Sequence, residues 1–298
     1  MIKTRCMVLV PAGPTTIREY LDDTLESINH HVGSANCIIA IVDDSRVSRF
    51  ARLGDVFPNV VVLEAEDYGE GAEHTTQGAL WCKQAHALKY LLQRYHFDLL
   101  LRMDTDALMI GDAPDEDVLA FFRSRPEVGL VGAFRRRGDG TDKTTAMTLK
   151  GRELTREMRL YRGLRDPKLV WTLRGLVKMA ERHGYRRGDM CTGGACFLAR
   201  EAIDAMHARG FLDLDVLRRS QMMDDGLLGL LCSAAGYHLA DLPEDSDVLA
   251  VNWRGLPMPI GVLVEKGKKI VHSIKDEDEA VERTIRAYFR ERRQRAAR

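Results

Sequence analysis

The sequence has no pair of cysteines at the C-x-x-C spacing of a zinc or redox motif, and it has little proline. Its 298 residues include six cysteines and nine prolines. The cysteines are scattered, mostly inside apolar runs, at positions 6, 37, 82, 191, 196 and 232. This usage argues against a disulfide framework, so we expect buried, reduced thiols in a cytosolic protein. The composition also excludes a disordered or fibrous chain.

Net charge and long apolar runs are absent as well. The chain carries 44 basic and 44 acidic residues, for a formal net charge of zero, and we therefore expect no nucleic-acid partner. The uncharged stretch 226–239 contains polar side chains and is shorter than the ~20 apolar residues of a membrane-spanning helix. The start of the chain, residues 1–13, fits a first core strand better than a signal peptide. We expect a cytoplasmic protein with no transmembrane segment.

The sequence does contain a regular alternation of apolar runs and amphipathic segments. Continuous apolar runs predict buried strands, and apolar residues at helical spacing predict helices that pack on them. The expected strands are 6–10, 37–42, 59–63, 97–103 and 128–134, and the expected helices include one from residue 17 to 28, 79–95 and 117–124. Such alternation indicates an α/β protein with a mostly parallel sheet covered by helices.

Two segments interrupt this pattern and hold the excess positive charge. Residues 135–189 contain 16 Lys and Arg against 7 Asp and Glu, a net of +9, and we expect a loop followed by helices there. The last 18 residues, 281–298, contain seven arginines and two glutamates. They predict a charged helix that frays into a tail, either solvated or attached peripherally to anionic lipid. The rest of the chain is correspondingly acidic.

Acidic residues follow two of the predicted strands directly. Asp43 and Asp44 follow strand 37–42, and Asp104-Thr105-Asp106 follows strand 97–103. Ligands of parallel α/β sheets bind at the carboxyl ends of strands. Carboxylates at the end of a buried strand are costly to desolvate unless a cation or hydrogen-bond donors compensate, and a divalent ion that bridges to a phosphate is one such cation. The alternative for an isolated D-x-D is a solvated turn.

Six motifs follow one another along the chain, with a D-x-D motif at the centre of the set. They are Val10-Pro11-Ala12, Val42-Asp43-Asp44-Ser45, Asp104-Thr105-Asp106, Thr192-Gly193-Gly194-Ala195-Cys196-Phe197-Leu198, Asp224-Asp225-Gly226-Leu227-Leu228-Gly229 and Val271-His272-Ser273-Ile274-Lys275. This ordered set resembles the nucleotide-sugar-dependent glycosyltransferases of the GT-A fold superfamily. The resemblance covers residues 6 to 275. It implies a Rossmann-like GT-A fold, a mixed and mostly parallel sheet flanked by helices.

The resemblance also implies a domain organisation and a donor site. Residues 1–280 would form a single glycosyltransferase domain, with 135–189 as a basic helical insert or lid on the acceptor side and 281–298 as an Arg-rich C-terminal helix or tail. A nucleotide-sugar donor, with UDP as the expected carrier, would bind to Pro11, Ala12, Asp43, Asp44, Lys83, Arg102, Asp104, Thr105 and Lys275. For Lys83 and Arg102, a solvated or salt-bridged side chain is an equally good interpretation.

The metal, the base and the acceptor residues follow from the same resemblance. Mn²⁺ or Mg²⁺ would bind to Asp104, Asp106 and His272, and the imidazole favours Mn²⁺. Asp225, at the start of a predicted helix, would act as general base for transfer with inversion; the alternative is a helix N-cap at Asp224 or Asp225. The residues expected to contact the acceptor or the sugar are Gly193, Gly194, Asp224 and Trp253. The glycine pair also fits a tight turn, and His272 alone fits a structural histidine.

We therefore expect a metal-dependent enzyme of the hexosyltransferase type that moves a sugar from a nucleotide diphosphate to an acceptor hydroxyl. One alternative is a haloacid-dehalogenase-like phosphohydrolase with Asp104 as nucleophile, although Leu108 stands where that class expects Thr or Val. Another is an inactive nucleotide-sugar-binding protein, which leaves the acidic set unexplained. A nucleotidyltransferase would need a glycine-rich, basic signature after the first strand, and Pro11-Ala12-Gly13-Pro14-Thr15 lacks it.

Overall fold

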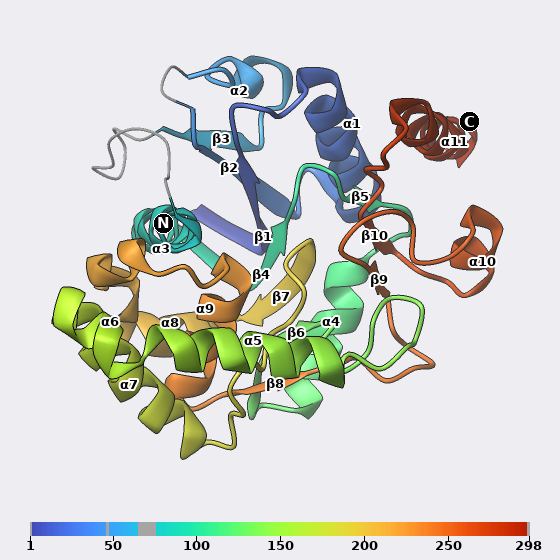
Figure 1. The fold of residues 1–298 in the computed structure, drawn as a ribbon. Helices are drawn as coiled ribbons and strands as arrows, with labels where there is room; N and C mark the ends of the chain where they lie inside the picture. The colour runs from blue at the N-terminus through green and yellow to red at the C-terminus, as the bar shows by residue number, and fades with distance from the viewer. Residues whose placement is uncertain (1, 46–47, 65–75, 297–298) are drawn as a thin grey trace.

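The structure, a computed structural model, describes residues 2–45, 48–64 and 76–296. Its centre is a seven-stranded sheet with the order β3-β2-β1-β4-β7-β6-β8 (Figure 1). The strands are β1 (Ile2–Ala12), β2 (Cys37–Asp43), β3 (Val60–Leu63), β4 (Tyr95–Met103), β6 (Val128–Gly132), β7 (Ala195–Ala199) and β8 (His238–Ala240). The mixed, mostly parallel sheet flanked by helices confirms the predicted fold class.

Strand direction determines which loops meet at the ligand-binding edge. Strands β1, β2, β3 and β4 pair in parallel, as do β6 and β8. Strand β7 is antiparallel to both of its neighbours, β4 and β6. The carboxyl ends of β1, β2, β4 and β6 therefore lie at the same edge as the amino end of β7.

Helices cover both faces of this sheet. In Figure 1, α3, α8 and α9 lie on one side of it, and α1 and α4 lie on the other. Their bounds are α1 (Arg18–Ile28), α3 (Gln77–Arg94), α4 (Pro114–Ser124), α8 (Arg200–Ala208) and α9 (Asp224–Ala234), with shorter turns at α2 (Leu53–Val56), η1 (Asn29–Gly33), η3 (Phe211–Asp213) and η4 (Asp215–Arg219). All six cysteines are buried and free, as expected.

A second, smaller sheet lies beside the main one, in the order β5-β10-β9. Its strands are β5 (Leu108–Met109), β9 (Leu249–Val251) and β10 (Ile270–His272), and α10 (Ile260–Glu265) precedes β10. Helix α11 (Glu279–Ala296) packs against this unit through Ile285 and Phe289, which are buried. Arg286 and Arg293 of α11 are buried too, so along the described residues the arginine-rich helix is docked on the protein and differs from the solvated tail that was expected.

The basic segment 135–189 is largely helical. It contains α5 (Thr144–Glu157), α6 (Leu160–Arg165) and α7 (Pro167–Glu181), and α7 packs on α9. In Figure 1 these helices form one layer at the bottom of the view, next to α9. Among the described residues, none of the helices combines the length and the apolar content that a bilayer crossing requires.

Candidate active site

The antiparallel pairing of β7 with β4 brings two distant motifs together. Met103 at the end of β4 is paired with Ala195 at the start of β7. Asp104 therefore lies beside Gly194, and its N–H donates to the carbonyl of Gly194 at 2.9 Å. The D-x-D loop and the glycine pair thus form one wall of a site at the edge of the sheet where α/β proteins bind ligands.

The three predicted metal ligands lie together. The ligand atoms of Asp104, Asp106 and His272 are all within 4.8 Å of one another. Nε2 of His272 is 3.2 Å from Oδ1 of Asp106 and 3.7 Å from Oδ2 of Asp104. The small sheet explains this arrangement, because β5 follows the D-x-D loop and β10 pairs with β5, which returns His272 to the loop. Two carboxylates and an imidazole form a donor set suited to Mn²⁺ or Mg²⁺.

The second nitrogen of His272 supports the same interpretation. Nδ1 lies 2.8 Å from the carbonyl oxygen of Asn252. Since a carbonyl oxygen only accepts hydrogen bonds, Nδ1 carries the proton and Nε2 faces the two carboxylates. A ligating histidine usually has its other ring nitrogen fixed in this way. Ser273 donates to Oδ2 of Asp106 at 2.6 Å, which orients that carboxylate as well. The residues present therefore fit a divalent cation.

The electrostatics of this cluster reflect its charge pairs. Burial alone would lower the pKa of His272, but the hydrogen bond and charge of Asp106 outweigh it and raise that pKa above the ordinary value. Burial alone would raise the pKa of Asp106, yet the contacts with His272 and Ser273 hold it below the ordinary value. For Asp104, burial dominates and raises the pKa, although Arg102 opposes it.

Arg102 connects the metal cluster to helix α9. Its guanidinium lies 2.8 Å from Asp104 and 2.7 Å from Asp224, and it donates to the carbonyl of Gly193 at 2.9 Å. Gln84 of α3 also donates to Asp224, at 2.9 Å. Burial alone would lower the pKa of Arg102. The charges of Asp104 and Asp224 together have the larger effect and raise that pKa above the ordinary value, so the guanidinium stays charged. The structure thus shows the salt-bridged Arg102 that the sequence also allowed, and its contact with a donor stays a prediction.

Asp225 has one oxygen without a partner. Its Oδ2 accepts from the N–H of Gly193 at 3.1 Å, whereas its Oδ1 is buried and has no hydrogen-bond partner among the described residues. Met223 occupies the N-cap position of α9, so neither Asp224 nor Asp225 is the N-cap residue, and the N-cap alternative does not hold. Burial, reinforced by the charge of Asp224, raises the pKa of Asp225 to about 7. Such a carboxylate can accept a proton near neutral pH.

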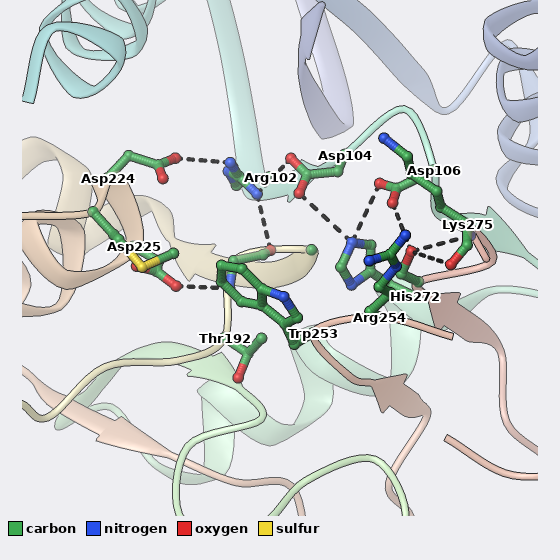
Figure 2. A pocket seen from close by; sticks show the side chains of 14 residues that line it. Arg102, Asp104, Asp106, Thr192, Asp224, Asp225, Trp253, Arg254, His272 and Lys275 are labelled. Carbon is green, nitrogen blue, oxygen red and sulfur yellow. Dashed lines mark hydrogen bonds and ion pairs between the residues drawn. The ribbon is translucent and has the colours of Figure 1, made fainter. Parts of the chain in front are cut away.

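These groups line one cavity of about 450 Å³, which we call the central cavity. Figure 2 shows Asp224 and Asp225 at one end of it, and Asp104, Asp106 and His272 at the other. The predicted residues that line it are Arg102, Asp104, Asp106, Gly193, Gly194, Asp224, Asp225, Trp253, His272 and Lys275. The structure therefore brings together the residues predicted for the metal, the base and the acceptor.

A smaller hollow of about 220 Å³ adjoins the central cavity. It is lined by Pro11, Ala12, Gly13, Asp44, Leu80, Arg102, Asp104 and Asp224. The last three residues also line the central cavity, so the two spaces share a wall. Three residues predicted for the nucleotide, Pro11, Ala12 and Asp44, thus lie next to the metal cluster.

Three further residues predicted for the donor line neither of these two spaces. Asp43 accepts hydrogen bonds from the backbone N–H groups of Ser45 and Arg49, at 2.9 and 3.1 Å. Lys83 is buried and forms an ion pair with Asp44. The carbonyl of Thr105 accepts hydrogen bonds from two side chains, those of Thr24 at 3.1 Å and Arg286 at 3.3 Å. Their contacts with a donor stay predictions.

Several residues of the site were missed at the sequence level. Thr192, Met223, Arg254 and Ser273 also line the central cavity. Ser273 lies inside the quoted C-terminal motif, and its neighbour His272 was a signal that could have identified it. Gln84 lies within helix α3, and no local pattern shows that it reaches Asp224.

Comparison with solved structures matched parts of this chain to three proteins described here. No family model and no curated protein matches the chain. The mannosyltransferase PcManGT from Pyrobaculum calidifontis, in complex with GDP-Man and Mn²⁺, has 17% identity and a TM-score of 0.44 over 85% of this chain and 59% of its own. The bifunctional glycosyltransferase WbbM has 13% identity and a TM-score of 0.45, over 90% and 45%. TarS from S. aureus, residues 1–349, has 16% identity and a TM-score of 0.33, over 43% and 35%.

This chain spans less than two thirds of the length of each of these three structures.

Proposed function

We propose that this protein is a metal-dependent glycosyltransferase of the hexosyltransferase type, which moves a sugar from a nucleotide diphosphate donor to an acceptor hydroxyl. One observation carries the proposal. A single cavity holds a carboxylate and imidazole cluster at one end and a buried carboxylate with an unpartnered oxygen at the other (Figure 2). Sugar transfer from a diphosphate needs these two elements, a cation for the leaving group and a base for the nucleophile.

The donor would lie across the two adjoining spaces. Its nucleoside, which we propose to be uridine, fits the hollow beside Pro11, Ala12 and Asp44. The diphosphate then lies at the shared wall near Asp104, within reach of Lys275, whose exposed side chain lines the central cavity. When bound, a divalent cation at Asp104, Asp106 and His272 supplies positive charge to the departing diphosphate.

Asp225 is positioned for the proton transfer. The acceptor hydroxyl gives its proton to the carboxylate of Asp225, which lines the central cavity, while its oxygen forms the bond to the anomeric carbon. The bond between that carbon and the diphosphate oxygen breaks, and its electron pair leaves with the nucleotide diphosphate. The attacking oxygen and the leaving group are on opposite faces of the sugar, so configuration at the anomeric carbon inverts. The N–H of Gly193, which binds Oδ2, fixes the direction of the carboxylate.

Thermal unfolding with nucleotides and metal tests the proposal, because a ligand that binds only the native state raises the melting temperature. UDP, GDP and their sugars are compared with and without Mn²⁺. We expect a rise that requires both nucleotide and metal in the wild type, and no metal-dependent rise in Asp106→Ala. Asp98→Asn is the matched control, because Asp98 is an exposed carboxylate on the same strand, β4. Metal-independent binding, or normal binding by Asp106→Ala, contradicts the proposal.

The phosphohydrolase alternative makes a different prediction for the same enzyme. It requires Asp104 to attack a phosphate, and it releases inorganic phosphate from a phosphomonoester without any nucleotide sugar. In the structure, Oδ1 of Asp104 is paired with Arg102 at 2.8 Å. Phosphate release that is abolished by Asp104→Asn and is unaffected by Asp225→Asn would favour the hydrolase. Transfer of the sugar to a hydroxyl acceptor, followed by mass spectrometry, would favour the transferase.

A further inference from the structure

A second cavity of about 370 Å³ has Asp225 in its lining, as the central cavity does, and we call it the basic cavity. Its walls come from the segment 135–189, the start of α9 and the end of β9. It is lined by Arg137, Lys143, Ala146, Met147, Lys150, Met190, Thr192, Met223, Asp225, Val251, Asn252 and Trp253. Four of these residues, Thr192, Met223, Asp225 and Trp253, also line the central cavity. A molecule in the basic cavity therefore reaches the proposed base directly.

The charge of this cavity differs from that of the central one. Three cationic side chains line it, Arg137, Lys143 and Lys150, against one carboxylate, Asp225. None of the three metal-cluster residues is among its lining residues. A diphosphate that binds at the metal cluster therefore does not account for these cations.

Lys143 is the cation with the most constrained surroundings. It is only 5% exposed, and its ammonium donates to the carbonyls of Ala133 at 2.7 Å and Met190 at 3.2 Å. Within the described part of the chain, no carboxylate forms an ion pair with it. Burial lowers the pKa of Lys143, and Asp225 is among the charges that oppose this effect. Burying an ammonium without an ionic partner is costly, so an anionic ligand here would relieve a penalty that the free protein bears.

Arg137 and Lys150 add positive charge to the lining of the cavity. Arg137 is exposed and, among the described residues, has no ion-pair partner. Lys150, on α5, pairs with Glu153 at 2.9 Å, but both side chains are partly exposed, and such pairs are weak in water. Both cations are therefore available to a ligand.

The remaining lining is apolar. Met147, Met190 and Met223 present thioether side chains, and Trp253 is 71% exposed, so its indole has a free face. An indole face of this kind packs against the apolar face of a sugar ring. The cavity thus offers an apolar platform next to Asp225 and positive charge around it.

We propose that the acceptor of this enzyme is an anionic hydroxyl compound, whose phosphate or carboxylate group binds in the basic cavity near Lys143, Lys150 and Arg137. This inference rests on the proposed glycosyltransferase function. The ring or chain that bears the hydroxyl lies against Trp253 and the methionines. The hydroxyl points to the carboxylate of Asp225, a residue that lines both cavities. The basic segment 135–189 thereby takes part in acceptor recognition.

Binding of three matched probes tests this inference without requiring turnover. The probes are glucose 6-phosphate, glucuronate and methyl glucoside, titrated calorimetrically into protein that is saturated with Mn²⁺ and the nucleotide diphosphate that binds best. Saturation blocks the metal cluster as an alternative anion site. We expect one or both charged probes to bind at least about tenfold more tightly than the neutral sugar, as one charge-assisted contact would produce. The phosphate and carboxylate probes together identify which anion the site prefers.

The double variant Arg137→Gln/Lys150→Gln should remove this preference and weaken binding of the charged probe about tenfold. The side chain of Arg137 is exposed and that of Lys150 is partly exposed, so we expect the double variant to keep the fold. The matched control is Lys168→Gln/Lys178→Gln, which removes two exposed charges from α7, away from the cavity lining. Equal binding of neutral and charged probes, no binding of either charged probe, or an unchanged preference in the double variant overturns the inference.

Binding of the nucleotide and Mn²⁺ is measured first in the same samples. Its absence contradicts the proposed function itself. Its presence together with no anionic preference contradicts only the assignment of the acceptor.

Discussion

A Cβ atom added at Gly194 would lie 1.9 Å from Nδ1 of His272 and 2.0 Å from its Cγ. The backbone of Gly194 therefore lies directly against the imidazole ring, at a distance that no side chain permits. The family resemblance predicted that this glycine pair contacts the acceptor or the sugar, and the pair also fitted a tight turn. In the structure, a glycine is required at position 194 for a steric reason. The missing side chain leaves room for the imidazole of His272, a proposed metal ligand.

Gly194→Ala should therefore weaken metal binding. The added methyl group forces the imidazole away from Asp106, and loss of a correctly oriented ligand typically lowers metal affinity about 10–100-fold. Titration of Mn²⁺ followed by electron paramagnetic resonance measures this directly. Gly175→Ala is the control, because a Cβ at this exposed position in α7 meets nothing within 4 Å. Equal Mn²⁺ affinities of wild type and Gly194→Ala would remove His272 from the metal site.

The placement of the metal cluster was only partly predictable from the sequence. Asp104 and Asp44 each directly follow a strand that is apolar in sequence. Their positions at the ligand-binding edge were predictable, because the carboxyl ends of parallel strands lie at the same edge of a sheet. The strand register that brings His272 to Asp106 depends on two- and three-residue strands, which are too short to produce a recognisable pattern. For that residue the resemblance to a family supplied the prediction.

The partners of long-range ion pairs were not predictable. For Arg102 the sequence left a phosphate contact and a salt-bridged side chain open, and it indicated no partner for the bridge. Its partner Asp224 lies 122 residues away in the sequence, on an element whose packing depends on the whole fold. Periodicity describes which face of an element is buried, but it does not show which polar groups meet there.

Arg102→Lys should destabilise the protein while conserving its charge. The single ammonium group of lysine cannot replace the planar guanidinium group of Arg102, which contacts Asp104 and Asp224 through two different nitrogens. Loss of one buried hydrogen bond to a charged group lowers the free energy of unfolding by about 2 kcal/mol. Urea denaturation measures the difference, with Arg18→Lys as control, since Arg18 pairs with Asp22 at the surface. Identical free energies of unfolding for wild type and Arg102→Lys would show that the stability of the protein does not depend on both contacts of Arg102, with Asp104 and with Asp224.

Asp23 should anchor the C-terminal helix. It is 1% exposed and forms ion pairs with Arg286 at 3.1 Å and with Arg293, both on α11. Asp23→Ala leaves two buried guanidinium groups without this carboxylate, and removal of one partner of a buried pair destabilises by about 3–5 kcal/mol. Asp22→Ala, one residue away and partly exposed, should change stability by less than about 1 kcal/mol. Chemical denaturation followed by circular dichroism compares them, and equal effects would show that α11 is not held by these pairs.

Asp225→Asn should separate binding from transfer. The amide keeps the shape of the side chain but accepts no proton, so donor binding is retained while kcat falls by about 10²–10⁴. In the wild type, kcat/KM should rise with pH up to about 7, the pKa to which burial and Asp224 raise Asp225, and level off above it. A pH profile of sugar transfer measures both effects. Unchanged turnover in Asp225→Asn would exclude Asp225 as the base.

The same carboxylate should also make stability depend on pH. Because the folded protein holds the proton of Asp225 up to about pH 7, whereas an unfolded Asp loses it near pH 4, this group stabilises the native state at low pH. The contribution is lost as pH rises through 7. Between pH 5 and pH 8 the wild type should therefore lose on the order of 2 kcal/mol relative to Asp225→Asn, whose amide does not titrate. Urea unfolding of both proteins at the two pH values isolates this difference, since the other titrating groups are common to them. If the two stability curves run parallel, the native carboxylate titrates near its unfolded value, and its raised pKa no longer supports the general-base role.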